Sequence, residues 1–126
     1  SNNCKILGNL NREELKIFYH LSTVVVSFPL QAEGFGRTIS EALIMKKKII
    51  AFNYGGVKDQ LENLDDIYKV NIHEHEDIKL KLQKIIQLDK EQFSNISSFS
   101  RDFIIKSFSK SQMVKNYFNL YEQETI

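Results

Sequence analysis

The fold of this chain is decided by residues 23–52, which read TVVVSFPLQAEGFGRTISEALIMKKKIIAF. The stretch begins and ends with apolar, β-branched runs, at 23–27 and 49–52, in which polar and apolar residues do not alternate. Such runs are typical of strands that are buried on both faces of a parallel sheet. Between the runs, apolar residues recur at helical spacing over 37–45. The stretch therefore predicts a strand, a helix and a second parallel strand.

The residues before this unit predict a further strand and a capped helix. Residues 5–8 (KILG) are an apolar run that ends in glycine, and we expect a short strand followed by a turn. Asn11 and Glu14 have the spacing of a capping box, so a helix capped by Asn11 should run to about residue 20. The inner face of this helix should carry Leu15, Phe18 and Tyr19.

The residues after the unit change from strand–helix alternation to helices alone. With a weaker strand at 67–70, the elements predict the α/β class, a Rossmann-like parallel sheet flanked by helices. One helix face in the last third comprises Ile78, Leu82, Ile85 and Ile86. A second apolar stripe near the terminus comprises Met113, Val114, Tyr117, Phe118 and Tyr121. Either the sheet domain itself or another domain or chain can cover this stripe.

Composition and charge exclude several classes of protein. Of the 126 residues, 42% are hydrophobic and 26% are charged, which is globular composition with room for one domain. A formal net charge of +1 is unlike the strongly basic footprint of a nucleic-acid binder. The single cysteine, Cys4, excludes an intrachain disulfide. The longest uncharged stretch, 21–32, is shorter than the about 20 residues of a membrane-spanning helix.

The loop between the first strand and the helix of the central unit is suited to binding an anion. It follows the carboxyl end of a parallel strand, where open α/β sheets bind their ligands. The backbone N–H groups of Gly36, Arg37 and Thr38 would point out of the helix N-terminus and form a phosphate site. Gly34 and Gly36 lack side chains, so a ligand can approach the backbone closely.

Two glutamates flank this anion site. Glu33 precedes it, and Glu41 lies one helical turn inside, on the same face as Arg37. Carboxylates repel bound phosphate, so they are better explained as acceptors for hydroxyl groups. A sugar hydroxyl at Glu33, a diphosphate at the helix end and ribose hydroxyls at Glu41 together describe a nucleotide sugar.

This combination of motifs resembles the retaining GT-B glycosyltransferases called glycosyl transferases group 1, or family four. Their mark is two glutamates separated by seven residues, which is the spacing of Glu33 and Glu41. Here the pair lies in an EGFG…EA context after an apolar strand and a proline, and KIIAF (48–52) and GGV (55–57) follow at family-like distance. The resemblance covers about residues 5–88. It implies the donor-binding, C-terminal half-domain of a GT-B fold.

The resemblance also implies a role for each matched residue. Glu33 would be the catalytic residue, in contact with hydroxyls of the donor sugar, and Glu41 would hold the ribose. Gly55 and Gly56 would shape the far wall of the donor pocket. The donor sugar and the diphosphate would be bound by five consecutive residues: Gly34, Phe35, Gly36, Arg37 and Thr38. Further cations for the diphosphate would come from basic residues outside this chain.

Activity, cofactors and partners follow from the same resemblance. The family transfers a sugar from a nucleotide donor with retention and without a required metal, so we expect a UDP- or GDP-sugar and no cofactor. Arg-Thr after the last glycine is similar to bacterial enzymes of surface-polysaccharide synthesis, which implies polysaccharide or glycolipid synthesis in the cytoplasm. The full-length protein would act there with peripheral association at the inner face of the cell membrane. No nucleic-acid partner is expected.

The chain is expected to be one partial domain, 1–126, with a donor-binding Rossmann-like region at 5–88 and C-terminal helices at 89–126. It begins with Ser1 and matches only the latter part of the family's donor-binding domain. We therefore expect a fragment that lacks the N-terminal acceptor domain and transfers no sugar by itself.

Other interpretations remain open or are set aside. The chain could instead be a non-catalytic or split-enzyme subunit that pairs through its C-terminal helices, or a nucleotide-responsive domain. A dinucleotide fingerprint is set aside because Ile39 occupies the position of its third glycine. The HEH sequence at 73–75 is interpreted as a solvated loop rather than a metal site. The three lysines at 46–48 are expected at a solvent-facing helix end.

Overall fold

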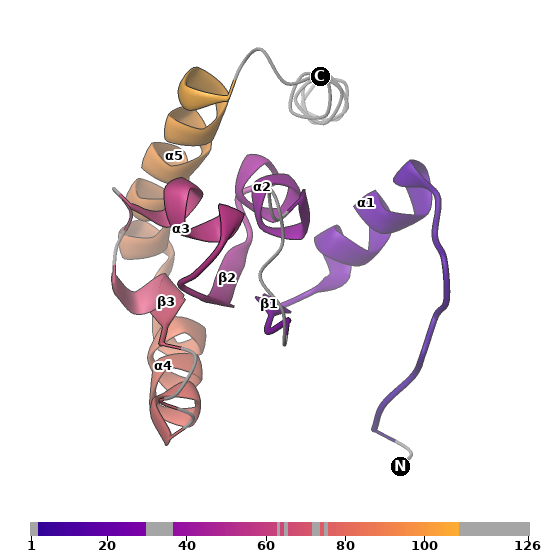
Figure 1. Ribbon diagram of the computed structural model, residues 1–126, viewed down its shortest axis with the longest axis horizontal. Helices are drawn as coiled ribbons and strands as arrows, with labels where there is room; N and C mark the ends of the chain where they lie inside the picture. Colours follow the sequence, from indigo (N-terminus) through magenta and orange to yellow (C-terminus); the bar gives the residue numbers. More distant parts are fainter. Residues whose placement is uncertain are drawn as a thin grey trace.

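The computed structural model of the chain describes residues 3–29, 37–62, 64, 66–71, 74 and 76–108. Within them, three parallel strands form one sheet in the order β1–β2–β3 (Figure 1). The strands are β1 (Val24–Ser27), β2 (Lys48–Phe52) and β3 (Lys69–Val70). β2 is central because it pairs with both neighbours. The α/β class and the parallel sheet predicted from residues 23–52 are therefore confirmed.

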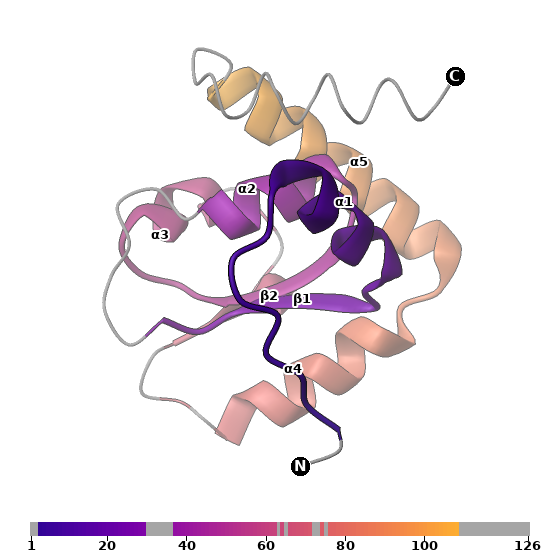
Figure 2. The same ribbon diagram turned by 90° about the vertical axis from the view of Figure 1, so that its right-hand side faces the viewer.

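Helices cover the two faces of the sheet unequally. Figure 2 shows α1 (Arg12–Leu21), α2 (Arg37–Ile44) and α5 (Lys90–Ser107) on one side of the sheet and α4 (Glu76–Gln87) on the other. α2 packs on β1 and β2 and is itself covered by α5. All residues of α2 from 39 to 44 are consequently buried. The core joins this helix to the middle of the sheet, and its largest fully buried side chains include Ile39, Leu43, Ile44, Ile49, Ile50, Leu61, Tyr68 and Ile104.

α1 begins with the predicted capping box. The Asn11 side chain accepts a hydrogen bond from the Glu14 backbone N–H at 2.8 Å, and the Glu14 carboxylate accepts one from the Asn11 backbone N–H at 3.2 Å. Two donors that a helix N-terminus would otherwise leave unpaired are thus satisfied, an arrangement that stabilises a helix by about 1 kcal/mol. Local sequence alone therefore places the start of α1.

α2 ends in a turn that usually contains glycine. Lys46 has a φ of 56°, in the left-handed region. Its N–H donates to the carbonyl of Leu43, and the N–H of Lys47 donates to the carbonyl of Ala42 at 2.9 Å. This is the hydrogen-bond pattern of the Schellman motif, in which a residue with a Cβ atom is strained by about 1–2 kcal/mol.

Replacing Lys46 by glycine is expected to stabilise the protein by about 0.5–1 kcal/mol, because relief of the strain outweighs the extra freedom of the unfolded chain. The free energy of unfolding from urea titration measures the change. Lys84→Gly, in an exposed position of α4, is the matched control and should destabilise by about 1 kcal/mol. A loss of stability in both variants would contradict the proposed strain at Lys46.

Two of the three lysines predicted at a solvent-facing helix end, Lys47 and Lys48, are partly buried and contact the ends of other helices. The Lys47 ammonium donates to the carbonyl of His20 at 3.1 Å, and the Lys48 ammonium donates to the carbonyl of Ile86 at 3.2 Å. Burial lowers the pKa of Lys47. Each of the two carbonyls lies in the last turn of a helix, where a cation is favoured by the helix dipole. The two side chains thus attach the ends of α1 and α4 to the start of β2, which a local sequence pattern cannot show.

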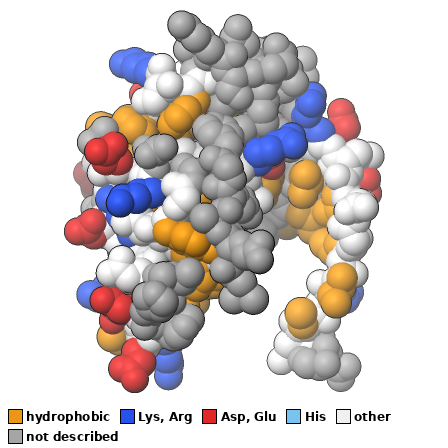
Figure 3. Space-filling model, in the orientation of Figure 1, with side chains coloured by type: hydrophobic (Ala, Val, Ile, Leu, Met, Phe, Trp, Pro, Cys, Tyr) orange, Lys and Arg blue, Asp and Glu red, His pale blue; other side chains and the backbone are white. Residues whose placement is uncertain are grey.

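The strand predicted at residues 5–8 does not form. This segment is extended but unpaired, and the side chain of Ile6 is 96% exposed. Figure 3 shows apolar side chains along the N-terminal segment, at the edge of the molecule. The segment has two apolar side chains, Ile6 and Leu7, which bury too little surface to offset the entropy lost on ordering it. Gly8, with a φ of 71°, provides the predicted turn in open solvent.

Two further predictions of burial are wrong for reasons of packing. β1 was expected to be buried on both faces, but Val26 is 48% exposed because α4 covers β2 and the 3-10 turn Asp66–Tyr68 rather than β1. Phe18 and Ile86 lie at the margins of the inner faces of their helices and are largely exposed.

Two elements differ from expectation: one strand is shorter than predicted, and one helix was not predicted. The weaker strand at 67–70 is reduced to the two residues of β3 by the 3-10 turn. The six-residue helix α3 (Gly56–Leu61) was not predicted, because it is too short to show helical periodicity.

Two side-chain contacts connect the carboxyl ends of β1 and β2. The Tyr54 hydroxyl donates to the carbonyl of Pro29 at 2.5 Å, and the rings of Phe28 and Phe52 lie 4.8 Å apart.

The predicted apolar stripe from Met113 to Tyr121 lies outside the described residues. Among the helices that the structure describes, none combines the length and the apolar character needed to cross a bilayer.

Candidate functional site

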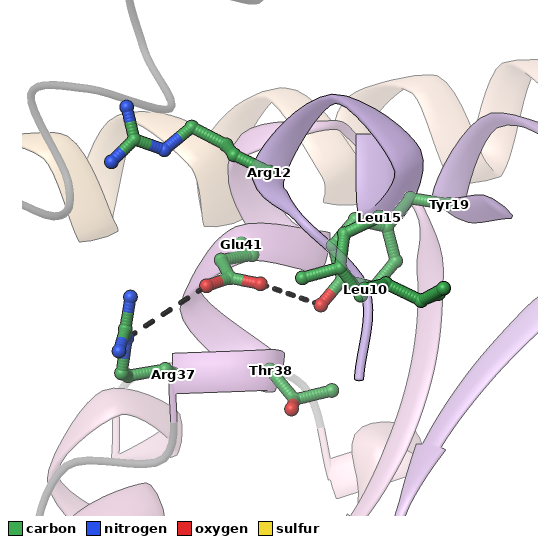
Figure 4. A pocket seen from close by; sticks show the side chains of 7 residues that line it. All are labelled: Leu10, Arg12, Leu15, Tyr19, Arg37, Thr38 and Glu41. Carbon is green, nitrogen blue, oxygen red and sulfur yellow. Dashed lines mark hydrogen bonds and ion pairs between the residues drawn. The ribbon is translucent and has the colours of Figure 1, made fainter. Parts of the chain in front are cut away.

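A pocket of about 420 Å³ lies between α1 and the start of α2. Its two walls come from helices that are separated in sequence by β1 and by the loop that carries the glutamate–glycine motif. Figure 4 shows the described side chains that line it: Leu10, Arg12, Leu15, Tyr19, Arg37, Thr38 and Glu41. The structure therefore brings three of the predicted site residues, all from α2, together with four residues that were given no functional role.

Glu41 is the central charged group of this pocket. Its side chain is buried, with only 4% of the residue exposed, because α2 is enclosed by the sheet and α5. The Tyr19 hydroxyl donates to Glu41 Oε2 at 2.6 Å, and Arg37 Nε lies 3.9 Å from Glu41 Oε1. In Figure 4, Tyr19 approaches the carboxylate from one side and Arg37 from the other. A buried carboxylate is costly unless hydrogen bonds or opposite charges compensate it, and these two contacts contribute to that compensation.

Arg37 follows the geometry that sequence spacing predicted. It lies four residues before Glu41 and forms an ion pair with it on the same helical face. The Arg37 side chain is 69% exposed, so its guanidinium reaches the open part of the pocket. Thr38 follows it in the first turn of α2 and also lines the pocket (Figure 4). The first turn of a helix also presents unpaired backbone N–H groups, which favour an anion.

Arg12 adds a second cation that sequence reasoning missed. It is the first residue of α1 and extends over the same pocket (Figure 4). Further cations for the diphosphate were expected from basic residues outside this chain, and this stays a prediction. Within the chain, the pocket has one guanidinium from α1 and one from α2. A guanidinium can bind phosphate through two parallel hydrogen bonds. The only local signal was that Arg12 directly follows the helix cap, and that signal does not indicate which element α1 faces.

The pocket is suited to a polar ligand, because its lining includes positively charged guanidinium groups and a negatively charged carboxylate. Two guanidinium groups and a helix N-terminus suit a phosphate or diphosphate, and a carboxylate suits a pair of hydroxyl groups. Leu15 of α1 and Leu10, which lies two residues before the start of α1, contribute an apolar wall. Within the described residues, no group of three or more His, Cys, Asp or Glu side chains is arranged to hold a metal ion.

The remaining predicted site residues lie elsewhere in the chain. Glu33 and the run from Gly34 to Gly36 fall outside the described residues. Gly55 caps α3 with a φ of 65°, and Gly56 is the first residue of that helix, after the carboxyl end of β2. Their assignment to the far wall of a donor pocket stays a prediction.

The fold and the pocket define a Rossmann-like α/β domain in which the start of a helix lies beside a buried carboxylate. Comparison with known families agrees with this class: the model of the family described as glycosyl transferases group 1 matches residues 1–102. The chain belongs to the glycosyl transferases group 1 family, and the family expected from the two glutamates is confirmed. Searches of curated proteins and of solved structures returned no match.

Proposed function

We propose that this chain binds the nucleotide-sugar donor of a retaining glycosyltransferase of GT-B architecture, in family four. The observation that carries the proposal is the buried carboxylate of Glu41 in a pocket shared with Arg12 and Arg37. A nucleoside diphosphate has a ribose diol and a diphosphate a few ångströms apart. The carboxylate supplies acceptors for the diol, and the two guanidinium groups supply donors for the diphosphate.

The proposed reaction depends on stabilising a leaving group. When the sugar leaves the nucleotide, negative charge develops on the diphosphate, and preorganised cations and amides stabilise it best. Arg37 and the first turn of α2 would serve this purpose, together with the backbone of residues 34–36. Glu33 would contact the sugar near its anomeric carbon. Because guanidinium and amide groups supply the compensating charge, the proposal includes a UDP- or GDP-sugar and no metal.

The proposal extends to the biological setting. The acceptor would bind to an N-terminal domain, and residues 1–126 would transfer no sugar by themselves. The complete enzyme would make bacterial surface polysaccharide or glycolipid in the cytoplasm, at the inner face of the cell membrane. These statements rest on the family resemblance of the residues around Glu33 and Glu41.

Isothermal titration of the chain with UDP and with GDP tests the proposal. We expect binding of at least one nucleotide, and we expect Glu41→Gln to weaken it by about 10-fold or more. The amide keeps the shape of the side chain but loses the charge and one acceptor, and a hydrogen bond to a charged group contributes about 1.5–3 kcal/mol.

Glu13→Gln is the matched control, because Glu13 is exposed on α1 and does not line the pocket. Its nucleotide affinity should equal that of the unchanged chain. Absence of binding to either nucleotide, or equal affinities of the Glu41→Gln and Glu13→Gln variants, would contradict the proposed function. Thermal unfolding of each variant shows whether the fold is retained.

A further inference from the structure

The contact between Tyr19 and Glu41 joins two helices through the functional carboxylate. The residues are 22 positions apart, and both are nearly buried, at 7% and 4% exposed. The oxygen–oxygen distance of 2.6 Å is that of a charge-assisted hydrogen bond between a hydroxyl and a carboxylate. Tyr19 is held in turn on the inner face of α1, whose start is set by the capping box. The hydroxyl thus reaches Glu41 from a rigid element.

This hydrogen bond restricts how the carboxylate can be oriented. A carboxylate has two oxygens with about four acceptor directions, and its terminal torsion is broad when nothing holds it. Tyr19 engages Oε2, and Oε1 lies on the side of Arg37 (Figure 4). The plane of the carboxylate is therefore set before a ligand arrives. A preorganised acceptor loses little entropy when it binds a hydroxyl group of defined geometry.

An oriented, buried carboxylate selects for ligands that carry the matching hydroxyl groups. A ligand that lacks a hydroxyl leaves the polar group of the site unpaired, and the cost of that unpaired group is the basis of selectivity. A carboxylate that rotates freely can instead turn toward water or toward Arg37. The free-energy cost of binding a ligand that lacks the hydroxyl then becomes smaller. Selectivity for ribose over deoxyribose is thus a direct measure of how firmly Glu41 is oriented.

We propose that Tyr19 is a positioning residue that makes this pocket selective for ribonucleotides over 2′-deoxyribonucleotides by orienting Glu41. The inference rests on the proposed function, since it takes Glu41 as the group that binds the ribose. Tyr19 donates to Oε2 of Glu41, and the hydroxyl groups of the ligand would bind to the same carboxylate once it is held in this orientation. Neither the spacing of the two glutamates nor the family assignment indicates this role for α1.

The test compares a ribonucleotide with its 2′-deoxy form by isothermal titration. The probes are UDP with 2′-deoxy-UDP and GDP with 2′-deoxy-GDP, and the pair whose ribonucleotide binds more tightly is used. The unchanged chain is expected to favour the ribonucleotide by about 10-fold or more. Tyr19→Phe is expected to reduce this ratio by about 5-fold, mainly through weaker ribonucleotide binding, with the affinity for the deoxynucleotide changed by less than about 2-fold.

Tyr54→Phe is the matched control. It removes a hydroxyl that also donates a hydrogen bond between distant segments, to the carbonyl of Pro29, but it does not touch Glu41. Its selectivity ratio should equal that of the unchanged chain. A role of Tyr19 that is only structural would lower the thermal midpoint and both affinities together, and would leave the ratio unchanged; that outcome overturns the inference.

A double-mutant cycle provides a second, independent measurement. If Tyr19 acts through Glu41, adding Tyr19→Phe to Glu41→Gln should leave the already reduced ratio unchanged. A further fall in the ratio would show that Tyr19 acts on the ligand by another route, and the inference would be wrong. The cycle is read at a temperature below the thermal midpoint of every variant.

The same experiment separates failure of the inference from failure of the proposed function. If the unchanged chain binds neither ribonucleotide, or binds both forms equally, Glu41 does not hold a ribose and the proposed function itself fails. If the unchanged chain is selective and Tyr19→Phe is equally selective, only the role of Tyr19 is rejected.

Discussion

Replacing Ile50 by alanine is expected to lower the free energy of unfolding by about 2–5 kcal/mol. Ile50 lies in the middle of β2, the central strand, opposite Val26 of β1, and it is fully buried. Alanine removes apolar atoms from the layer between sheet and helices and leaves a cavity that the sheet cannot close. Domains of this size are stable by only about 5–15 kcal/mol, so much of the stability would be lost.

Urea unfolding followed by far-ultraviolet circular dichroism measures this loss. Ile17→Ala is the matched control, since Ile17 is 57% exposed on α1. The control should change the free energy of unfolding by less than about 0.5 kcal/mol, because surface substitutions away from specific contacts have small effects. Similar losses in the two variants would show that β2 is not the centre of the core. The slope of the urea dependence should stay equal in all three proteins, which checks that the unfolding remains two-state.

Reversing the charge of Arg37 is expected to weaken nucleoside diphosphate binding by about 100-fold. Arg37→Glu removes a guanidinium that can form a bidentate contact with phosphate, which contributes about 1.5–3 kcal/mol. It also introduces an anion beside the start of α2, where it repels both the ligand and Glu41. About 3 kcal/mol in total corresponds to roughly two factors of ten in affinity.

The control for this change is Lys79→Glu, which alters net charge by the same amount at an exposed position of α4. α4 lies on the opposite side of the sheet from α2 (Figure 2), so nucleotide affinity should change by less than about 2-fold. The effect of Arg37→Glu should become smaller as salt is raised from about 0.05 M to 0.5 M, because the interaction is partly exposed and is screened. Equal loss in both variants would mean that net charge, and not contact in the pocket, decides affinity.

The capped helix and the central parallel unit were predictable because their signals are local. The capping box needs only residues 11–14, and the strand–helix–strand alternation of residues 23–52 needs only apolar periodicity. The placement of Arg37 and Glu41 on one helical face follows from their spacing of four residues. Each of these features depends on residues that are close together in the sequence. A local pattern is therefore enough to predict it.

Features that depend on which elements meet were not predictable. The exposure of Val26 depends on where α4 lies, and the capping of α1 and α4 by Lys47 and Lys48 depends on the approach of helix ends to the start of β2. Residues 5–8 are the opposite case, in which the sequence predicted a strand that does not form. Their apolar pattern fits a strand, but a strand also requires a neighbour that pairs with its backbone groups.

The candidate site also combines features that were predictable from the sequence with features that were not. The family, the helix start that suits a diphosphate and the pairing of Arg37 with Glu41 were predictable from the sequence, because they are properties of a contiguous motif. The presence of Tyr19 and Arg12 in the same pocket was not predictable, because it depends on where α1 lies relative to α2. That position depends on contacts between residues far apart in the sequence, such as the buried Tyr19 of α1 and the buried Glu41 of α2. No single spacing encodes that position, and yet it sets the 2.6 Å contact that orients Glu41.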